Sequence, residues 1–281
     1  MPSPRAKLKP GKPARSGATA NAKPAAPPKG AARAKPAPAK AGKPVPSAGA
    51  ILAQMKPLGR ESYRKVMLNH GVEQPIWGVS IADMKKIQKR AGVKADYQLA
   101  LNLFESGVYD AMYFAGLLAD DPRMTRKDLQ RWVAQASGAL SEYTVPWVAA
   151  GSPHGRELAL EWIESKRPDT VCAGWSTLSN LASVTPDGEL DLAGLKALLQ
   201  RVQKTIHAQP NRVRYVMNNF VIAMGCFCKP LTAAAEAAAR AIGEVRVDMG
   251  GTACKVPDAL EYIDKVRQRG TLGRKRDSCK C

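Results

Sequence analysis

The segment 247–257 contains residue types that together could hold a phosphate group. Gly250 and Gly251 allow another backbone to approach closely, and Lys255 supplies a positive charge. Pro257 suits the first turn of a helix. Free amides at a helix start attract phosphate, and a lysine beside them adds to the attraction. The segment is therefore a candidate contact to a phosphate backbone, although its glycines could equally serve only to turn the chain.

A second group of residues combines one carboxylate with two aromatic rings. Glu142 is the only carboxylate in the segment 141–153. It could act in catalysis, or it could complement the dipole of a helix that Ser141 caps. Tyr143 and Trp147 lie four residues apart, so they share a helix face. They could form an aromatic lip at a binding site or belong to the core, which is the commoner place for such residues.

Two further basic or polar groups are candidates for backbone contacts. Arg214 and Asn218 are four residues apart on one predicted helix face, which suits phosphate contacts or a solvated surface. The C-terminal end is also basic, through Arg267, Arg269, Arg274, Lys275 and Arg276. Contacts to phosphates position a protein on a nucleic acid but read no sequence.

Four of the six cysteines form two CxC pairs, Cys226 with Cys228 and Cys279 with Cys281. The first pair lies in an apolar, helix-like run, and neither pair has the CxxC spacing of structural zinc sites. No export signal precedes them. We therefore expect reduced thiols, no metal and no cofactor.

The first 49 residues carry eleven Lys and Arg and no Asp or Glu, among Ala, Pro and Gly. So few apolar residues cannot offset the entropy lost on ordering, which predicts disorder over 1–49. An extended chain of one charge sign suits a polyanion, because each neutralised phosphate releases counterions. A solubilising leader is the alternative. The whole chain carries +19, so the rest is basic as well.

From about residue 50 to 268 the chain has the apolar spacing of successive helices. Ser80 with Asp83 and Thr125 with Asp128 resemble capping boxes, and Ser152 before a proline resembles an N-cap. Further helices are expected at 81–91, 96–106, 168–184, 191–207, 211–227, 231–242 and 257–268. A short strand near 245–248 is an alternative for that segment. Helices of this length joined by short turns predict an all-α fold of stacked antiparallel pairs, with a basic tail at 269–281. No apolar run is long enough to span a membrane.

Four stretches resemble the DNA alkylation repair family, the AlkD-like glycosylases built from HEAT-like helical repeats. They are PIWGVSIADMKKI (75–87), FESGVYDAMYFAGLLADDP (104–122), SEYTVPWVAAGSP (141–153) and VDMGGTACKVPDALEYI (247–263). The resemblance covers about residues 60–276. It implies an α-solenoid that cups duplex DNA and the excision of cationic alkylated purines such as 3-methyladenine and 7-methylguanine.

Cleavage of an N-glycosidic bond passes through a sugar cation, so the reaction needs a negative charge near C1′. In the active relatives this charge comes from a carboxylate four residues after a tryptophan, and those positions hold Ala139 and Tyr143 here. Glu142 is one position away, about 100° around a helix. An arginine pair of the family is replaced by Ala173 and Gly174, beside Trp175.

The resemblance and the residues together predict a DNA-binding protein, with excision of alkylated purines as its reaction. The alternatives are a binder of bent or damaged duplex without catalysis and a helical scaffold for a protein partner. Glu142 and Tyr143 are the catalytic candidates. The predicted DNA contacts are Trp77, Trp147, Trp175, Arg214, Asn218, Lys255, Arg274, Lys275 and Arg276. We expect a monomer on double-stranded DNA, in the cytoplasm at the bacterial nucleoid and away from membranes.

Overall fold

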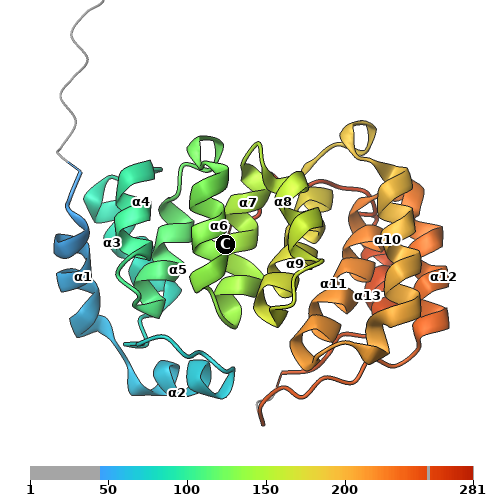
Figure 1. Ribbon diagram of the computed structural model, residues 1–281, viewed down its shortest axis with the longest axis horizontal. Coiled ribbons are helices and arrows are strands. Elements are labelled where there is room, and N and C mark those ends of the chain that lie inside the picture. Colours follow the sequence, from blue (N-terminus) through green and yellow to red (C-terminus); the bar gives the residue numbers. More distant parts are fainter. Residues whose placement is uncertain (1–44, 252–253, 281) are drawn as a thin grey trace, which may run out of the picture. The chain divides into compact units, whose positions relative to one another are not determined.

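In the computed structural model, which describes residues 45–251 and 254–280, every regular element is helical (Figure 1). The predicted all-α fold is confirmed. Most of the basic segment predicted to be disordered, residues 1–44, lies outside the described range. The first helix begins at Ala48, where Ser47 caps it through a hydrogen bond from the Ala50 amide.

The α-helices of the described residues are α1 (Ala48–Met55), α2 (Glu61–Asn69), α3 (Ile81–Ala91), α4 (Tyr97–Phe104), α5 (Tyr109–Leu118), α6 (Arg126–Gln135), α7 (Val145–Gly151), α8 (Gly155–Trp162), α9 (Pro168–Val184), α10 (Leu192–Thr205), α11 (Asn211–Phe227), α12 (Thr232–Ile242) and α13 (Ala259–Gln268). Short 3₁₀ turns and one π turn, η3 (Leu140–Thr144), connect several of them. The segment 245–248 is a loop, so the alternative of a strand there is wrong.

Alternate helices form a continuous row through the described residues. Helices α5, α7, α9, α11 and α13 contact one another in succession, and each also contacts the helix that precedes it in the chain (Figure 1). A single pair has too little apolar surface to bury by itself, so stacking of neighbours builds the core. Residues 43–281 belong to one compact unit.

Of the caps predicted at Ser80, Thr125 and Ser152, the first two are confirmed and the third is wrong. The Ser80 hydroxyl accepts from the Asp83 amide, and Thr125 forms a capping box with Asp128. Ser152 instead follows α7, where its hydroxyl donates to the Ala149 carbonyl and accepts from the backbone amide two residues later. The reason is a tight turn between α7 and α8: a Cβ on Gly155 would lie 2.2 Å from the Ala149 oxygen.

The core consists of two apolar clusters that meet between α8 and α9. The first contains a stacked pair, Phe104 and Trp132, with ring centroids 4.0 Å apart. The second contains Trp175, whose ring meets Phe220 edge-on at 5.1 Å. Trp175 is only 1% exposed, so its ring stabilises the core instead of lying on a surface.

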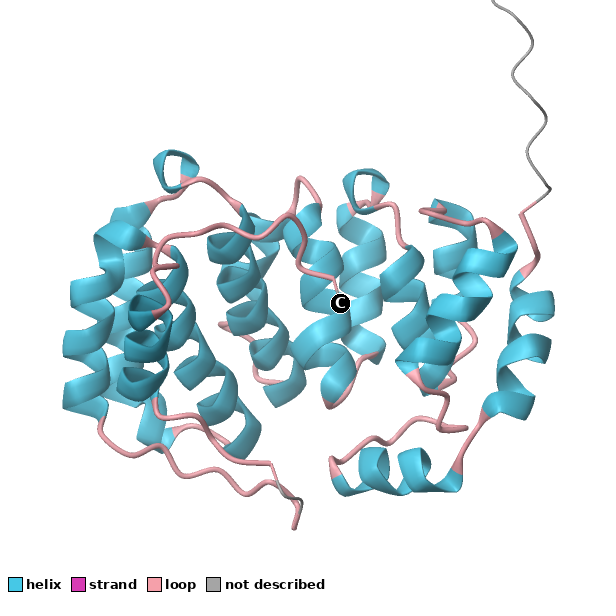
Figure 2. Ribbon diagram, turned by 180° about the vertical axis from the view of Figure 1, so that it is seen from behind, coloured by secondary structure: helices cyan, strands magenta, loops and turns pink. Residues whose placement is uncertain are grey.

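Residues 271–280, here called the C-terminal strap, run back across the helices (Figure 2). The Lys275 ammonium donates to the Ala182 carbonyl and pairs with Asp187, both at 2.8 Å or less. The Lys280 ammonium does the same with Ala119 and Asp121, at 2.7 Å each. Two backbone bonds, to the carbonyls of Cys226 and Ser183, fix the strap further. Lys275, one of the predicted DNA contacts, thus has its charge engaged within the fold.

Within the described residues, no single helix is long and apolar enough to span a membrane. Helix α11 and the segment Lys229–Ile242 reach that length and composition only together, and they are bent by 115° to each other.

The strap gives the protein a titratable contact. Burial raises the pKa of Asp121 to about 6, while Lys280 acts in the opposite direction. The folded chain therefore binds this proton at a higher pH than the unfolded chain does. The resulting stabilisation of the folded state is complete below about pH 4 and is lost as the pH rises through 6. We expect the free energy of unfolding of the wild type to fall relative to Asp121→Asn by up to about 3 kcal/mol between pH 4 and 7. Urea unfolding of both proteins across this range measures the difference, and parallel curves would contradict the assignment.

Candidate functional site

The turn η3 sets the direction of the Glu142 side chain. The Val145 amide bonds to the Leu140 carbonyl five residues back, which makes this a π turn. Pro146 has no N–H, so it cannot donate to the Glu142 carbonyl as an α-helix would require. Gly116 lets the turn pack closely on α5, because a Cβ there would lie 2.4 Å from the Thr144 methyl carbon. Ser141 is thus part of the turn and not an N-cap, so the prediction of a Ser141 cap is wrong, while Glu142 does lie in the first turn.

Glu142 forms a two-point ion pair with Arg212 of α11. The Arg212 Nε lies 2.6 Å from one carboxylate oxygen and its Nη2 2.5 Å from the other. The Glu142 side chain is 3% exposed and the Arg212 side chain 31%. Burial raises the pKa of Glu142, and the guanidinium opposes this rise. A carboxylate enclosed in this way is held by protein donors rather than presented to a ligand.

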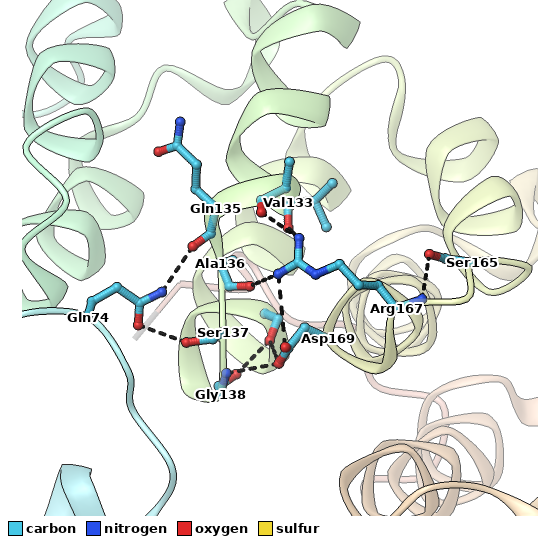
Figure 3. Close-up of polar contacts among 11 residues, drawn as sticks. Gln74, Val133, Gln135, Ala136, Ser137, Gly138, Ser165, Arg167 and Asp169 are labelled. Carbon is cyan, nitrogen blue, oxygen red and sulfur yellow. Dashed lines mark hydrogen bonds and ion pairs between the residues drawn. The ribbon is translucent and has the colours of Figure 1, made fainter.

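A second carboxylate, Asp169 in the first turn of α9, fixes the start of the π turn (Figure 3). It accepts from the Gly138 amide and the Ser141 hydroxyl, both at 3.1 Å. The neighbouring Arg167 donates to the carbonyls that end α6, among them that of Ala136 at 2.9 Å. The end of α6, the π turn and the start of α9 are therefore tied together.

Gln74 extends this network to the segment after α2 (Figure 3). Its amide donates to the Gln135 carbonyl at 3.0 Å, and its oxygen accepts from the Ser137 hydroxyl at 2.8 Å. The loop that follows α2 is thereby fixed to the same turn.

Aromatic side chains lie next to the ion pair. Tyr143 is 39% exposed, and its ring centroid lies 6.2 Å from that of Trp147. Trp147 is 6% exposed and meets Tyr113 edge-on at 5.4 Å. The Arg212 guanidinium lies over a further ring, that of Tyr215, 4.6 Å from its centroid. Of the two predicted aromatic residues, Tyr143 thus reaches the surface, and the buried Trp147 packs near it.

The end of α2 and the loop 248–251 approach each other beside this group. A Cβ on Gly250 would lie 2.1 Å from the Asn69 carbonyl oxygen, so this contact depends on glycine. The Arg212 guanidinium also reaches the Met249 sulfur at 3.6 Å, and Cys254 lies 3.9 Å from the His70 ring. Segments far apart in the chain thus meet around Arg212.

The other predicted contacts are distributed widely. Lys255, Arg274 and Arg276 are exposed, and Trp77 and Arg214 are half-buried. Asn218 is 3% exposed and donates to the Pro257 carbonyl at 2.8 Å, so it holds the start of α13 and presents no polar stripe to a ligand. Trp175 is excluded from the surface by its burial.

Sequence reasoning missed the basic partner of Glu142. Arg212 and Tyr215 are three residues apart and share one face of a helix that the sequence predicted correctly. This spacing is the one feature of the sequence that could have marked them as site residues. The ion pair joins residues seventy positions apart. A single sequence contains nothing that indicates such a pairing.

Comparison with known proteins identifies the family. The pattern of the family described as DNA alkylation repair enzyme matches residues 51–236. The chain belongs to this family, as the resemblance predicted. Two uncharacterized proteins, Lin0241 of Listeria innocua and Lmo0209 of Listeria monocytogenes, are each 36% identical over 210 residues, which cover 73% of this chain and 90% of theirs.

A solved structure is similar to this fold with a TM-score of 0.76 and 32% identity, covering 84% of this chain and all of that one. It is described as a new family of proteins related to the HEAT-like repeat DNA glycosylases with affinity for branched DNA structures. The helical-repeat fold is therefore that of the glycosylase relatives.

The ion pair can be tested by removing its cation. Arg212→Met leaves the Glu142 carboxylate buried without its partner, so we expect a loss of about 3 kcal/mol in the free energy of unfolding, the low end for a buried pair because Arg212 is partly exposed. Replacing both residues, as Glu142→Gln with Arg212→Met, removes the stranded charge and should recover at least half of the loss. Urea denaturation of the wild type, both single variants and the double variant gives the coupling energy. Additive effects of the two changes would contradict a direct pair.

Proposed function

We propose that this protein binds branched or bent duplex DNA by contacting the sugar-phosphate backbone of the DNA, and that it excises no base. One observation carries the proposal: Glu142, the only carboxylate of its segment, is buried and held at two points by Arg212. Glycosidic cleavage needs a negative charge free to approach the sugar. Asp169 is engaged as well, by Gly138 and Ser141.

Charge and similarity support DNA as the ligand. Outside the first 49 residues the chain still carries a net positive charge. A basic surface releases counterions from DNA and gives affinity without reading sequence. The similar solved structure belongs to proteins with affinity for branched DNA. A monomer at the nucleoid is consistent with this role and belongs to the same proposal.

Excision of cationic alkylated purines is the second candidate, and Tyr143 favours it. Its exposed ring follows Glu142 in the chain, and the ring face could attract a developing sugar cation. For this reaction the Arg212 pair would have to open when DNA binds.

The two candidates differ in base release. We expect no release of 3-methyladenine or 7-methylguanine above the uncatalysed rate from methylated duplex, in the wild type as in Glu142→Gln. Chromatography of the released bases measures this. Release by the wild type that Glu142→Gln abolishes, with DNA affinity unchanged, would show that the carboxylate is catalytic and that the second candidate is correct.

Binding itself is tested with a four-way junction and a linear duplex of the same arm sequences. We expect the junction to bind at least tenfold more tightly at one fixed salt concentration, and its affinity to fall steeply with salt. Removing residues 1–44 should lower the salt slope for both DNAs and leave the junction preference in place. Equal affinity for both DNAs would refute the branched-DNA proposal, and an unchanged slope would remove the N-terminal segment from the interface.

A further inference from the structure

Helix α2 differs from every other α-helix of the described residues because none of its residues is buried. Three of its nine residues are large apolar side chains in contact with solvent: Tyr63 at 44%, Val66 at 45% and Leu68 at 41% exposure. Tyr63 and Val66 are three residues apart and lie on one side of the helix. An apolar surface of this kind, left uncovered on a short helix, indicates a binding partner.

Both ends of α2 are nevertheless fixed. At its start, Gly59 and Gly78 let two backbone segments pass closely: a Cβ on Gly59 would lie 2.5 Å from the Trp77 oxygen, and one on Gly78 2.3 Å from the Arg60 oxygen. The Arg60 guanidinium is bonded to Asp83 at 2.8 Å. At its end, the Asn69 carbonyl contacts Gly250. The helix is thus held at both ends with its middle exposed, which leaves little ordering cost for a ligand that binds there.

The charge around α2 favours a polyanion. Residues 56–94 contain nine Lys and Arg and three Asp and Glu. Five of these cations lie at or just after α3. Three of them, Lys86, Lys89 and Arg90, line a pocket of about 400 Å³ together with Leu58 and one carboxylate, Asp83, which pairs with Lys86. The N-terminal segment of the same chain is a poor occupant for the apolar middle of α2, because residues 1–44 contain no large apolar side chain other than Met1 and Leu8.

We propose that α2 is the element that recognises the branch point of DNA: Tyr63 and Val66 pack against bases unstacked at the junction while the basic residues of 56–94 contact the flanking phosphates. The inference rests on the proposed function and assigns the recognition of branched DNA to the exposed side of α2. Apolar side chains that enter between base steps are a general way to hold a distorted duplex. Bases at a branch point expose their faces without the cost of unstacking a regular duplex, so such a wedge gives preference for branched over linear DNA.

The test is a double variant, Tyr63→Ala with Val66→Ala, in the full-length chain. Because neither side chain is buried, the thermal midpoint should not change. The control replaces two residues of similar exposure elsewhere, Tyr262→Ala with Leu160→Ala. Affinities are measured for a four-way junction and for the matched linear duplex, and 2-aminopurine at the branch point reports base stacking. Stacking of one base on an aromatic ring is strong enough for about a tenfold change in affinity.

We expect the α2 variant to bind the junction about tenfold more weakly and no longer to change the fluorescence of 2-aminopurine at the branch point. Its affinity for the linear duplex should be unchanged, and the control variant should equal the wild type in both measurements. Tyr63→Phe should retain the wild-type affinity, since the ring and not the hydroxyl makes the contact. An unchanged junction affinity of the α2 variant would overturn the inference and leave the helix as a surface for a protein partner. An equal loss on both DNAs would overturn the branch-specific role. A wild type without junction preference would refute the proposed function, and this inference with it.

Discussion

The pairing of Glu142 with Arg212 organises the centre of the described chain. It connects the π turn at the start of α7 with the first turn of α11, and α9 lies between them in contact with both. A buried carboxylate has to be matched by a cation with suitable geometry, so the positions of these helices relative to one another are constrained by the pair. The Tyr215 ring beneath the guanidinium and the Met249 sulfur beside it extend this constraint to the loop after α12. The same interaction that stabilises this arrangement also occupies the carboxylate that the sequence offered as a catalytic candidate.

Around this centre, backbone groups at helix ends are satisfied by side chains from distant segments. Arg167 bonds to the carbonyls at the end of α6, and Lys275 and Lys280 bond to carbonyls at or near the ends of α9 and α5. Carbonyls at the end of a helix have no partner within it and attract positive charge. A stack of helices creates many such ends, so part of the basic character of this chain has a structural use and is not available to a nucleic acid.

Local patterns in the sequence predicted the helices well. Apolar spacing located α9 to α12 with boundaries within two residues, and the caps at Ser80 and Thr125 are as expected. These features depend on neighbours in the chain, which a single sequence displays. The N-caps expected at Ser141 and Ser152 failed because tertiary contacts decided the local geometry: a π turn before Pro146 and a tight turn at Gly155.

The candidate site was predicted only in part. Glu142, Tyr143 and Trp147 do lie together, since they share one helical segment. Their surroundings come from residues thirty to seventy positions away, and no local pattern indicates which of many arginines lies opposite a given carboxylate. Burial also separated residues that look alike in the sequence: Tyr143 reaches the surface, whereas Trp175 is enclosed by the core.

The π turn has a consequence for the direction of the Glu142 side chain. A π turn holds one residue more than an α-helical turn between the same two ends. Removing one residue from Leu140–Thr144 would therefore restore an α-helical register and rotate the side chains that precede the deletion by about 100° relative to α7. A deletion after Glu142 would thus turn its side chain away from Arg212. The length of this turn, set by a single residue, therefore decides whether the Glu142 carboxylate meets Arg212.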